Sequence, residues 1–369
     1  MAAAALALLL PPIASADFAI NLQPPATSIA REIYDLHTVI LWICAAIFVV
    51  VFVPMFVAIA RHRKSAGHPA AKFHDNTRLE IAWTVVPVLI LIGMAWPATQ
   101  TVLAMKDTSK ADLTIKVTGH QWKWEYEYLG GQSDDNIRFI STLATPQEQI
   151  NNQAAKDDTY LLAVDRPLVV PTGKKIRLVL TSSDVIHAWW IPAFGVKQDA
   201  IPGFIRDSWF RVDAAGTYRG QCAELCGVGH GFMPIVVEAV PPERFAAWQQ
   251  EQQAQRAGAA AEAGKTWALA ELTALGEKVY SANCAVCHQP NGAGLPGTFP
   301  ALDGSQLVKG PKAAHLARVF NGKPGTAMAP FGKQLSDSEI AAVITYERNS
   351  WNNKLGDTVQ PAEIAALRK

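Results

Sequence analysis

The segment Gln221-Cys-Ala-Glu-Leu-Cys-Gly-Val-Gly-His-Gly-Phe-Met233 holds two thiols, an imidazole, a carboxylate and a thioether within thirteen positions. Sulfur and imidazole donors at this density suit copper or zinc much better than a hard cation. A blue-copper loop supplies one cysteine, one histidine and one weakly bound methionine, and this loop adds a second cysteine. Two thiolates four positions apart are able to bridge two metal ions. The segment therefore predicts a dinuclear copper loop.

Two alternatives for this segment remain open from the residues alone. Cys222 and Cys226 are able to form a disulfide in an oxidising compartment, and cysteine combined with histidine also binds zinc. Met233 argues against zinc, because a thioether is a poor zinc ligand but a common weak copper ligand. His187 ends the strand-like run Ser-Ser-Asp-Val-Ile-His, which a β-sandwich can bring beside the loop. With His187, His230 and one backbone carbonyl, the donor set favours two copper ions.

The composition sets broad limits. A chain of 369 residues is expected to form two or three units. Its net charge of +1, with 18% charged residues, gives no electrostatic case for binding nucleic acid. Four of the five cysteines form two close pairs, each soon followed by a histidine, which indicates metal and cofactor binding rather than a disulfide framework. The fifth, Cys44, lies in an apolar run and is predicted to be a small apolar filler.

The N-terminal region is predicted to enter a membrane. Residues 1–16 are apolar and end in Ala-Ser-Ala, as a signal peptide does, although they lack a basic start; an ordinary apolar N-terminus is the alternative. Residues 17–106 contain two apolar runs that predict membrane helices at about 38–60 and 81–103. Basic residues dominate the connection between them, so the connection is expected on the cytoplasmic side. Glu80 stands at the mouth of the second helix, as either a solvated acid or a proton-uptake group.

The rest of the chain predicts a sandwich, a linker and a helical domain. Residues 107–240 alternate in short runs, which indicates a Greek-key β-sandwich. The expected strands are 113–117, 122–128, 161–164, 168–170, 176–181, 208–212 and 235–240, with 130–158 as a long loop. Residues 241–268 indicate a partly helical linker. Residues 269–369 indicate a small all-α domain, with Ser336 and Glu339 as a capping box.

The helical domain carries Cys284-Ala-Val-Cys-His288, the strongest short motif in the chain. Two cysteines at this spacing attach haem by thioether bonds, and the adjacent histidine binds iron. A redox dithiol is the alternative. Met328, in a loop of small residues, is the expected sixth ligand, and His/Met ligation raises the haem potential. His315 competes for that role, but its helical setting predicts a surface position.

His187 and the segment Cys222–Met233 resemble the CuA motif of cytochrome c oxidase subunit II. The helical hairpin, Glu80-Ile-Ala-Trp-Thr and Gly119-His-Gln-Trp-Lys-Trp124 are similar to that family too, so the resemblance covers about residues 30 to 240. It implies that Cys222 and Cys226 bridge two coppers. It also implies these further copper ligands: His187, His230, Met233 and the main-chain carbonyl of Glu224.

The same resemblance implies roles beyond the copper ligands. The carboxylate of Glu224 would bind magnesium at the contact with subunit I, and Glu80 would be the acid at the entrance of a proton channel. Trp122 would be an exposed indole that accepts electrons from a docked donor, although Trp122 and Trp124 also suit a sandwich core. Lys123 departs from the family's usual tyrosine, so no role for that phenol carries over. Asp184 is equally a hydrogen-bond partner of a ligand or a turn residue.

Residues 271 to 350 resemble mono-haem cytochromes c, in which a proline carbonyl, here Pro300, holds the proximal histidine. The two resemblances together imply subunit II of a caa-type haem–copper oxidase. Electrons would come from a soluble cytochrome c or an upstream complex, pass through haem c and CuA, and reach subunit I for oxygen reduction and proton pumping. A fused donor gains effective concentration from its tether. Subunit III is a further expected partner, in a bacterial cell membrane with both termini on the periplasmic side.

Three other functions share parts of this pattern. A nitric oxide or nitrous oxide reductase subunit also carries CuA, but the membrane hairpin and the Glu80 motif weigh against nitrous oxide reductase. A quinol oxidase subunit has no use for intact copper ligands. A membrane-anchored copper-delivery protein has no need of the covalent haem motif.

Overall fold

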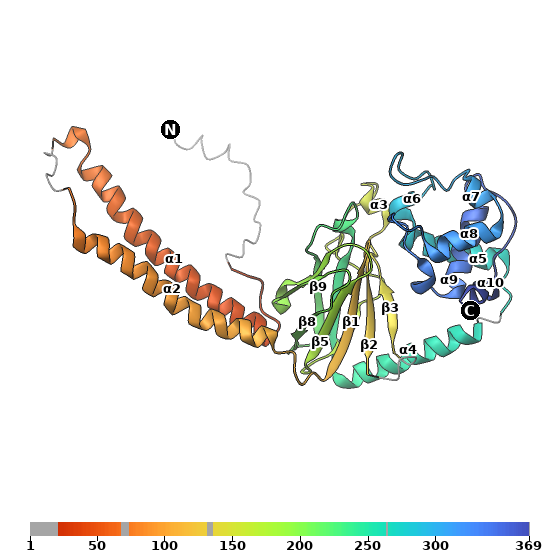
Figure 1. Ribbon diagram of the computed structural model, residues 1–369, viewed down its shortest axis with the longest axis horizontal. Helices are drawn as coiled ribbons and strands as arrows, with labels where there is room; N and C mark the ends of the chain where they lie inside the picture. The colour runs from red at the N-terminus through yellow and green to blue at the C-terminus, as the bar shows by residue number, and fades with distance from the viewer. Residues whose placement is uncertain (1–20, 68–73, 131–135, 263–264, 369) are drawn as a thin grey trace, which may run out of the picture. The chain divides into compact units, whose positions relative to one another are not determined.

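The computed structural model describes residues 21–67, 74–130, 136–262 and 265–368, so the predicted signal segment 1–16 lies outside the described residues. The chain divides into two compact units (Figure 1). Of the described residues, those in 21–25 and 29–102 belong to the first unit, and those in 26–28 and 103–368 to the second.

The first unit is a helical hairpin. Its helices are α1 (Ser28–Arg61) and α2 (Thr77–Lys106), and they lie side by side in Figure 1. Among the described residues these two helices are long and apolar enough to cross a membrane. Both extend beyond the predicted spans, because helical hydrogen bonding continues past the apolar residues into polar ends. Large apolar side chains such as Trp42 and Trp96 are exposed along them, as contact with lipid requires.

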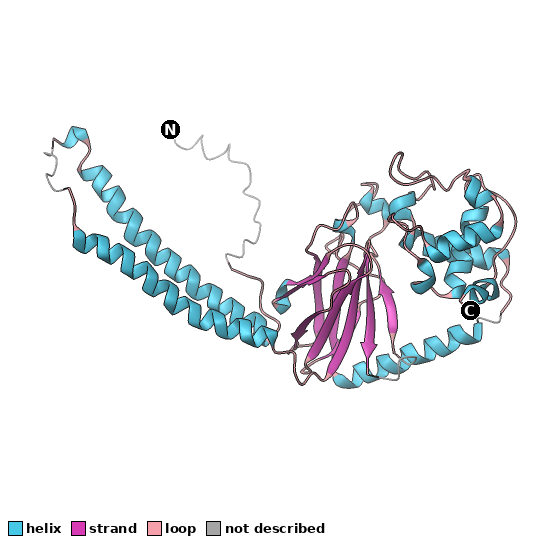
Figure 2. Cartoon of the chain, in the orientation of Figure 1, coloured by secondary structure: helices cyan, strands magenta, loops and turns pink. Residues whose placement is uncertain are grey.

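The second unit contains a β-sandwich of two five-stranded sheets (Figure 2). The first sheet has the order β3 (Arg138–Ser141), β2 (Lys123–Leu129), β1 (Leu113–His120), β5 (Ile176–Ser182), β8 (Arg206–Phe210). The second has the order β4 (Leu168–Pro171), β10 (Pro234–Val240), β9 (Gly216–Cys222), β6 (His187–Ile191), β7 (Val196–Ala200). β1 pairs with β5 in parallel, and so does β4 with β10. Strand β5 buries every second residue, which is the pattern that predicted it.

The predicted sandwich is confirmed, with local differences. The run 161–164 is a turn and not a strand, and the predicted loop 130–158 contains β3 and the short helix α3 (Gln147–Ile150). Strands β6, β7 and β9 were also not predicted. They carry little alternation, because β6 is almost wholly buried and β9 lies partly exposed. Trp124, Trp189 and Phe210 are fully buried in the core.

A helix leads from the sandwich to a helical domain (Figure 1). This helix, α4 (Pro242–Glu262), packs Phe245 and Trp248 against Tyr128 of β2, so the first part of the predicted linker belongs to the sandwich core. The helical domain contains α5 (Leu269–Asn283), α6 (Ala285–His288), α7 (Gln306–Lys309), α8 (Lys312–Asn321), α9 (Asp337–Asn349) and α10 (Pro361–Leu367).

Two local features shape the helical domain. Helices α5 and α9 approach so closely at Gly276 that a Cβ there would lie 2.1 Å from the main-chain oxygen of Ala342. Ser336 accepts a hydrogen bond from the Glu339 amide, and the Glu339 carboxylate accepts one from the Ser336 amide at 2.8 Å. The predicted capping box at the start of α9 is therefore present.

Candidate metal and haem centres

The candidate copper loop connects two neighbouring antiparallel strands. Cys222 ends β9, β10 begins at Pro234, and the Cys222 amide donates to the main-chain oxygen of Met233. His187 begins β6, which pairs with β9 so that Trp189 lies opposite Cys222. Sheet pairing therefore brings a histidine from 35 positions earlier beside the loop.

The donor atoms form a compact, nearly symmetric group. The Cys222 and Cys226 sulfurs lie 3.8 Å apart, in the centre. His187 Nδ1 is 4.0 Å from the Cys222 sulfur, and His230 Nδ1 is 3.5 Å from the Cys226 sulfur. Two weaker donors complete the group. The Met233 sulfur lies 3.5 Å from Cys226, and the main-chain oxygen of Glu224 lies 3.3 Å from Cys222.

This geometry distinguishes between a disulfide, a zinc site and a copper site. A disulfide requires sulfurs about 2.05 Å apart, so the 3.8 Å separation places Cys222 and Cys226 as two thiols. A tetrahedral zinc ion takes four donors. Six donors arranged around two central sulfurs exceed that number and include a thioether, which suits copper. The residues fit a dinuclear copper centre.

Asp184 orients one of the imidazoles. Its carboxylate lies 2.8 Å from His187 Nε2, which leaves Nδ1 facing Cys222, and it also accepts the Gln121 and Val185 amides. Burial opposes ionisation of Asp184, but the hydrogen bond from His187 and the two amides outweigh it and lower the pKa of Asp184. The residue is thus both a turn residue and a hydrogen-bond partner of a candidate ligand.

The two loop thiols lie within hydrogen-bonding distance of each other. A hydrogen bond from Cys226 lowers the pKa of Cys222, while the pairing with Cys222, together with burial, raises the pKa of Cys226. The pairing thus favours ionisation of Cys222. Copper would displace the thiol protons, because the thiolate is the form that ligates metal.

Trp122 lies against the copper loop and is buried. Its indole Nε1 donates to the main-chain oxygen of Cys226 at 3.0 Å, and Gln121 Nε2 donates to the same oxygen at 2.8 Å. A Cβ at Gly229 would lie 2.3 Å from the indole, so loop backbone packs directly on the ring. Only 8% of Trp122 is exposed, and the prediction of an exposed indole is wrong. Loop backbone and tertiary packing cover it.

The two predicted acids have different settings. The Glu224 side chain is exposed, while its main-chain oxygen lies beside the Cys222 sulfur. The carboxylate and the carbonyl of this residue therefore face different surroundings. Glu80 lies in the first turn of α2 and is exposed. The magnesium role of Glu224 and the proton role of Glu80 stay predictions.

The candidate haem motif lies at the junction of α5 and α6. Cys284 stands between the two helices, and Cys287 and His288 lie on α6. His288 Nδ1 is 2.8 Å from the Pro300 oxygen, which leaves Nε2 for iron. Burial raises the pKa of both thiols, that of Cys287 to about 11. Neutral thiols are poor redox nucleophiles, which argues against the dithiol alternative.

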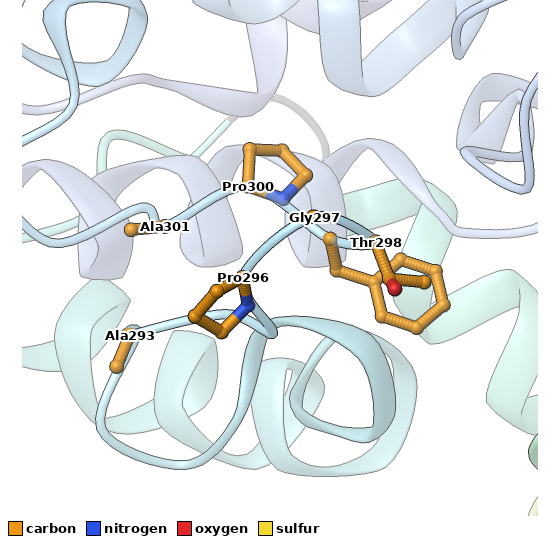
Figure 3. Close-up of a pocket in the computed structure, with 7 residues that line it drawn as sticks. Ala293, Pro296, Gly297, Thr298, Pro300 and Ala301 are labelled. Carbon is orange, nitrogen blue, oxygen red and sulfur yellow. The ribbon is translucent and has the colours of Figure 1, made fainter.

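A shallow pocket lies beside the proximal histidine. Figure 3 shows its lining along one loop: Ala293, Pro296, Gly297, Thr298, Phe299, Pro300 and Ala301. Met328 packs against the same apolar cluster that contains Cys284 and Ala285. Attachment cysteines, a histidine with its Nε2 available, an apolar wall and a thioether together fit a covalently bound haem.

His315 does not have the predicted surface position. It is 2% exposed, and its Nε2 lies 2.7 Å from the Glu347 carboxylate on α9. The helical pattern around His315 contained no sign of this partner, which lies 32 positions away. An imidazole engaged in a buried pair is a weaker candidate for the sixth haem ligand than Met328.

The burial of three polar residues, His120, Glu125 and Lys123, had no signal in the sequence. His120, to which the sequence assigned no role, is 5% exposed and lies 3.5 Å from the Glu125 carboxylate, which also accepts from Arg138 at 2.8 Å. Burial opposes ionisation of Glu125, but His120 and Arg138 outweigh it and lower its pKa to about 2. Lys123 is also buried, at 4% exposure.

Comparisons with known proteins agree with the geometry. The family described as cytochrome c oxidase subunit II matches with its periplasmic domain over residues 113–240 and its transmembrane domain over residues 15–101. The family described as cytochrome c oxidase, cbb3-type, subunit III matches residues 271–346.

Individual relatives point the same way. Cytochrome c oxidase subunit 2 of Cereibacter sphaeroides is 39% identical over 238 residues, covering 62% of this chain and 78% of the relative. A probable cytochrome c oxidase subunit 2 of Rickettsia felis is 40% identical, covering 62% and 70%. Among solved structures, the periplasmic domain of subunit II of cytochrome oxidase from Bradyrhizobium japonicum is 42% identical, covers 40% of this chain and 98% of that one, and has a TM-score of 0.35.

Proposed function

Because this chain belongs to the cytochrome c oxidase subunit II family, we propose that its own haem domain is the immediate electron donor to its own copper loop. The chain is a subunit of a haem–copper oxidase and passes electrons through CuA to subunit I, where oxygen is reduced. Membership of the family implies a CuA centre, and the cytochrome domain implies a haem c. Each of these groups carries one electron at a time when bound. The observation that carries the proposal is the coverage of Trp122, which leaves little indole surface for a diffusing donor.

The copper loop and His187 would together bind the two copper ions. Cys222 and Cys226 would bridge the two copper ions, with His187 and His230 binding one each. Met233 and the Glu224 carbonyl would be the weak ligands, supported by their positions at 3.5 and 3.3 Å from the two sulfurs. Weak ligands tune the potential of a copper site more than its affinity.

The residues of the haem domain would hold a six-coordinate haem. Cys284 and Cys287 would form the thioether bonds, His288 would bind iron through Nε2, and Met328 would bind the opposite face. The Pro300 carbonyl supports this assignment, because a hydrogen bond to Nδ1 fixes both the tautomer and the ring orientation. The apolar wall around Met328 would keep water from the iron.

Partners and location follow the same reasoning. The exposed Glu224 carboxylate would bind magnesium at the contact with subunit I, and Glu80 would accept protons at the cytoplasmic mouth of α2. The connection between the helices would be cytoplasmic and both termini periplasmic, in a bacterial cell membrane, supported by the basic residues between α1 and α2. Subunit III is proposed as a further partner, and a soluble cytochrome c or an upstream complex as the source of electrons for the haem domain.

One experiment tests the central proposal. The chain is purified with its associated subunits, its metals are counted, and visible and near-infrared spectra are recorded. Two coppers and one haem c per chain, together with a haem-bearing subunit I, are the expected result. Flash reduction of haem c should then be followed by copper reduction at a rate that does not depend on protein concentration. A concentration-dependent rate would make the donor a separate molecule and contradict the proposal.

A further inference from the structure

Lys123 joins the sandwich to the haem domain. It is the first residue of β2, between the buried Trp122 and Trp124, and only 4% of it is exposed. Its Nζ donates to Asn283 Oδ1 at 3.1 Å and lies 4.6 Å from the centre of the Phe331 ring. Asn283 is the last residue of α5, immediately before Cys284, and Phe331 follows Met328 by three positions.

The surroundings of this ammonium group are unusual. Among the described residues, no carboxylate lies within ion-pair distance of it, so its partners are a neutral amide and an aromatic ring. A lysine is rarely buried without a partner acid, because removing the charge from water is costly. A ring face and an amide oxygen offset part of that cost. These partners exist only when the haem domain sits on the sandwich.

Apolar contacts also join the haem domain to the sandwich. Cys287 and Phe299 of the haem domain pack against the core cluster that contains Trp122, Cys222 and Cys226. Cys287 is one of the predicted haem attachments, and Phe299 precedes the Pro300 that fixes His288. The edge of the haem domain that carries the attachment motif is therefore the edge that meets the sandwich.

We propose that Lys123 is the positioning residue that docks the haem domain on the copper domain, with its ammonium between the copper domain and the haem attachment motif. The inference rests on the proposed function, and it specifies which residue holds donor and acceptor together. It also gives a reason for a lysine at the position where the family usually has tyrosine: the partner here is a domain of the same chain.

The charge of Lys123 gives a direct readout of docking. A nearby cation stabilises a centre that has gained an electron, and this attraction weakens steeply when water separates the charges. The Lys123 ammonium therefore raises the haem potential only if the haem domain is docked in solution. A lysine that merely fills space in the sandwich would leave the haem potential unchanged on removal.

The test uses the full chain in its oxidase complex, loaded with copper and haem. Lys123→Met keeps an unbranched side chain, one atom shorter, and removes its charge. Its haem c potential is measured by spectroelectrochemical titration, and its haem-to-copper transfer rate by flash reduction. We expect the potential to fall and the rate to drop about tenfold, while Lys123→Arg retains the potential. Lys116→Met is the matched control, because Lys116 is 41% exposed on β1 of the same sheet, and it should change neither quantity.

A second variant keeps the test decisive if Lys123→Met folds poorly. Asn283→Ala removes the acceptor without altering the sandwich, and it should slow the transfer. Combined with Lys123→Met it should add little further loss, because both substitutions break the same contact. Unchanged potential and rate in Lys123→Met, or fully additive losses in the double variant, would overturn the inference. A parent chain without copper, haem or intramolecular transfer would instead contradict the proposed function.

Discussion

The indole nitrogen of Trp122 donates a hydrogen bond to the main-chain oxygen of Cys226 at 3.0 Å. This bond connects the turn between β1 and β2 to a sulfur-bearing residue of the copper loop. With Gln121 donating to the same oxygen, it also holds the loop backbone in place. Trp122 thus supports the loop, and it belongs to the core cluster against which Cys287 and Phe299 of the haem domain pack.

Replacing Trp122 with phenylalanine should slow electron transfer while the copper centre is retained. The variant loses the bond to Cys226, but the four proposed cysteine and histidine ligands and the bond from Gln121 remain. We expect at least a tenfold lower haem-to-copper rate with an unchanged copper spectrum, measured by flash reduction and near-infrared absorption. Trp248→Phe, on the sandwich-packed part of α4, is the control. Normal turnover in Trp122→Phe would remove this residue from the path.

Replacing Asp184 with asparagine should weaken copper binding. The carboxylate fixes the orientation of the His187 ring, and loss of such a partner typically costs about 10- to 100-fold in metal affinity. Competition against a copper chelator measures the change. Asp199→Asn, at an exposed position on β7, should leave the affinity unaltered. Equal affinities for the two variants would show that the loop holds its geometry without Asp184.

Replacing Met328 with alanine should leave haem covalently attached but change its ligation. The two cysteines and His288 are untouched, so the haem stays bound, while the loss of the thioether lowers its potential. Optical spectra and a redox titration follow the change. His315→Asn should retain the parent spectrum, although it breaks the buried pair with Glu347. A parent-like spectrum for Met328→Ala would instead make another side chain the sixth ligand.

Replacing Glu125 with glutamine should destabilise the sandwich in a pH-dependent way. The folded-state pKa of about 2 lies below the ordinary 4.5, so ionised Glu125 stabilises the fold above pH 4.5, and the stabilisation is lost as the pH falls toward 2. We expect a loss of about 2 kcal/mol at pH 7, because Arg138 is half exposed and its contribution is screened. Urea unfolding at pH 7 and pH 3 measures it. A loss that is the same at both pH values would reflect packing rather than charge.

Replacing Gly276 with alanine should destabilise the helical domain. The new Cβ would lie 2.1 Å from the Ala342 oxygen, so α5 and α9 must separate, at a cost of about 1–3 kcal/mol or more. Thermal melting of the haem domain, followed by haem absorbance, measures the loss. Gly258→Ala on α4 has open space around its Cβ and should be stabilising by about 0.5–1 kcal/mol. Equal melting of the two variants would contradict the close helix crossing.

The sequence by itself determined the features that depend on neighbouring residues. The copper loop and the haem motif each place their donors within a few positions, so spacing alone revealed the chemistry. The membrane helices follow from long apolar runs, and strand β5 from its alternation. The capping box at Ser336 is likewise a pattern of four consecutive residues.

Only the tertiary structure decided the features that join distant parts of the chain. Strand pairing brings His187 to Cys222, and the Glu347 carboxylate removes His315 from the surface. The partners of the buried Lys123 ammonium lie in a domain more than 150 positions later in the chain. Such contacts produce no periodic pattern in the sequence, because each joins only one residue to one other. The sequence alone therefore does not distinguish a buried polar residue from an exposed one.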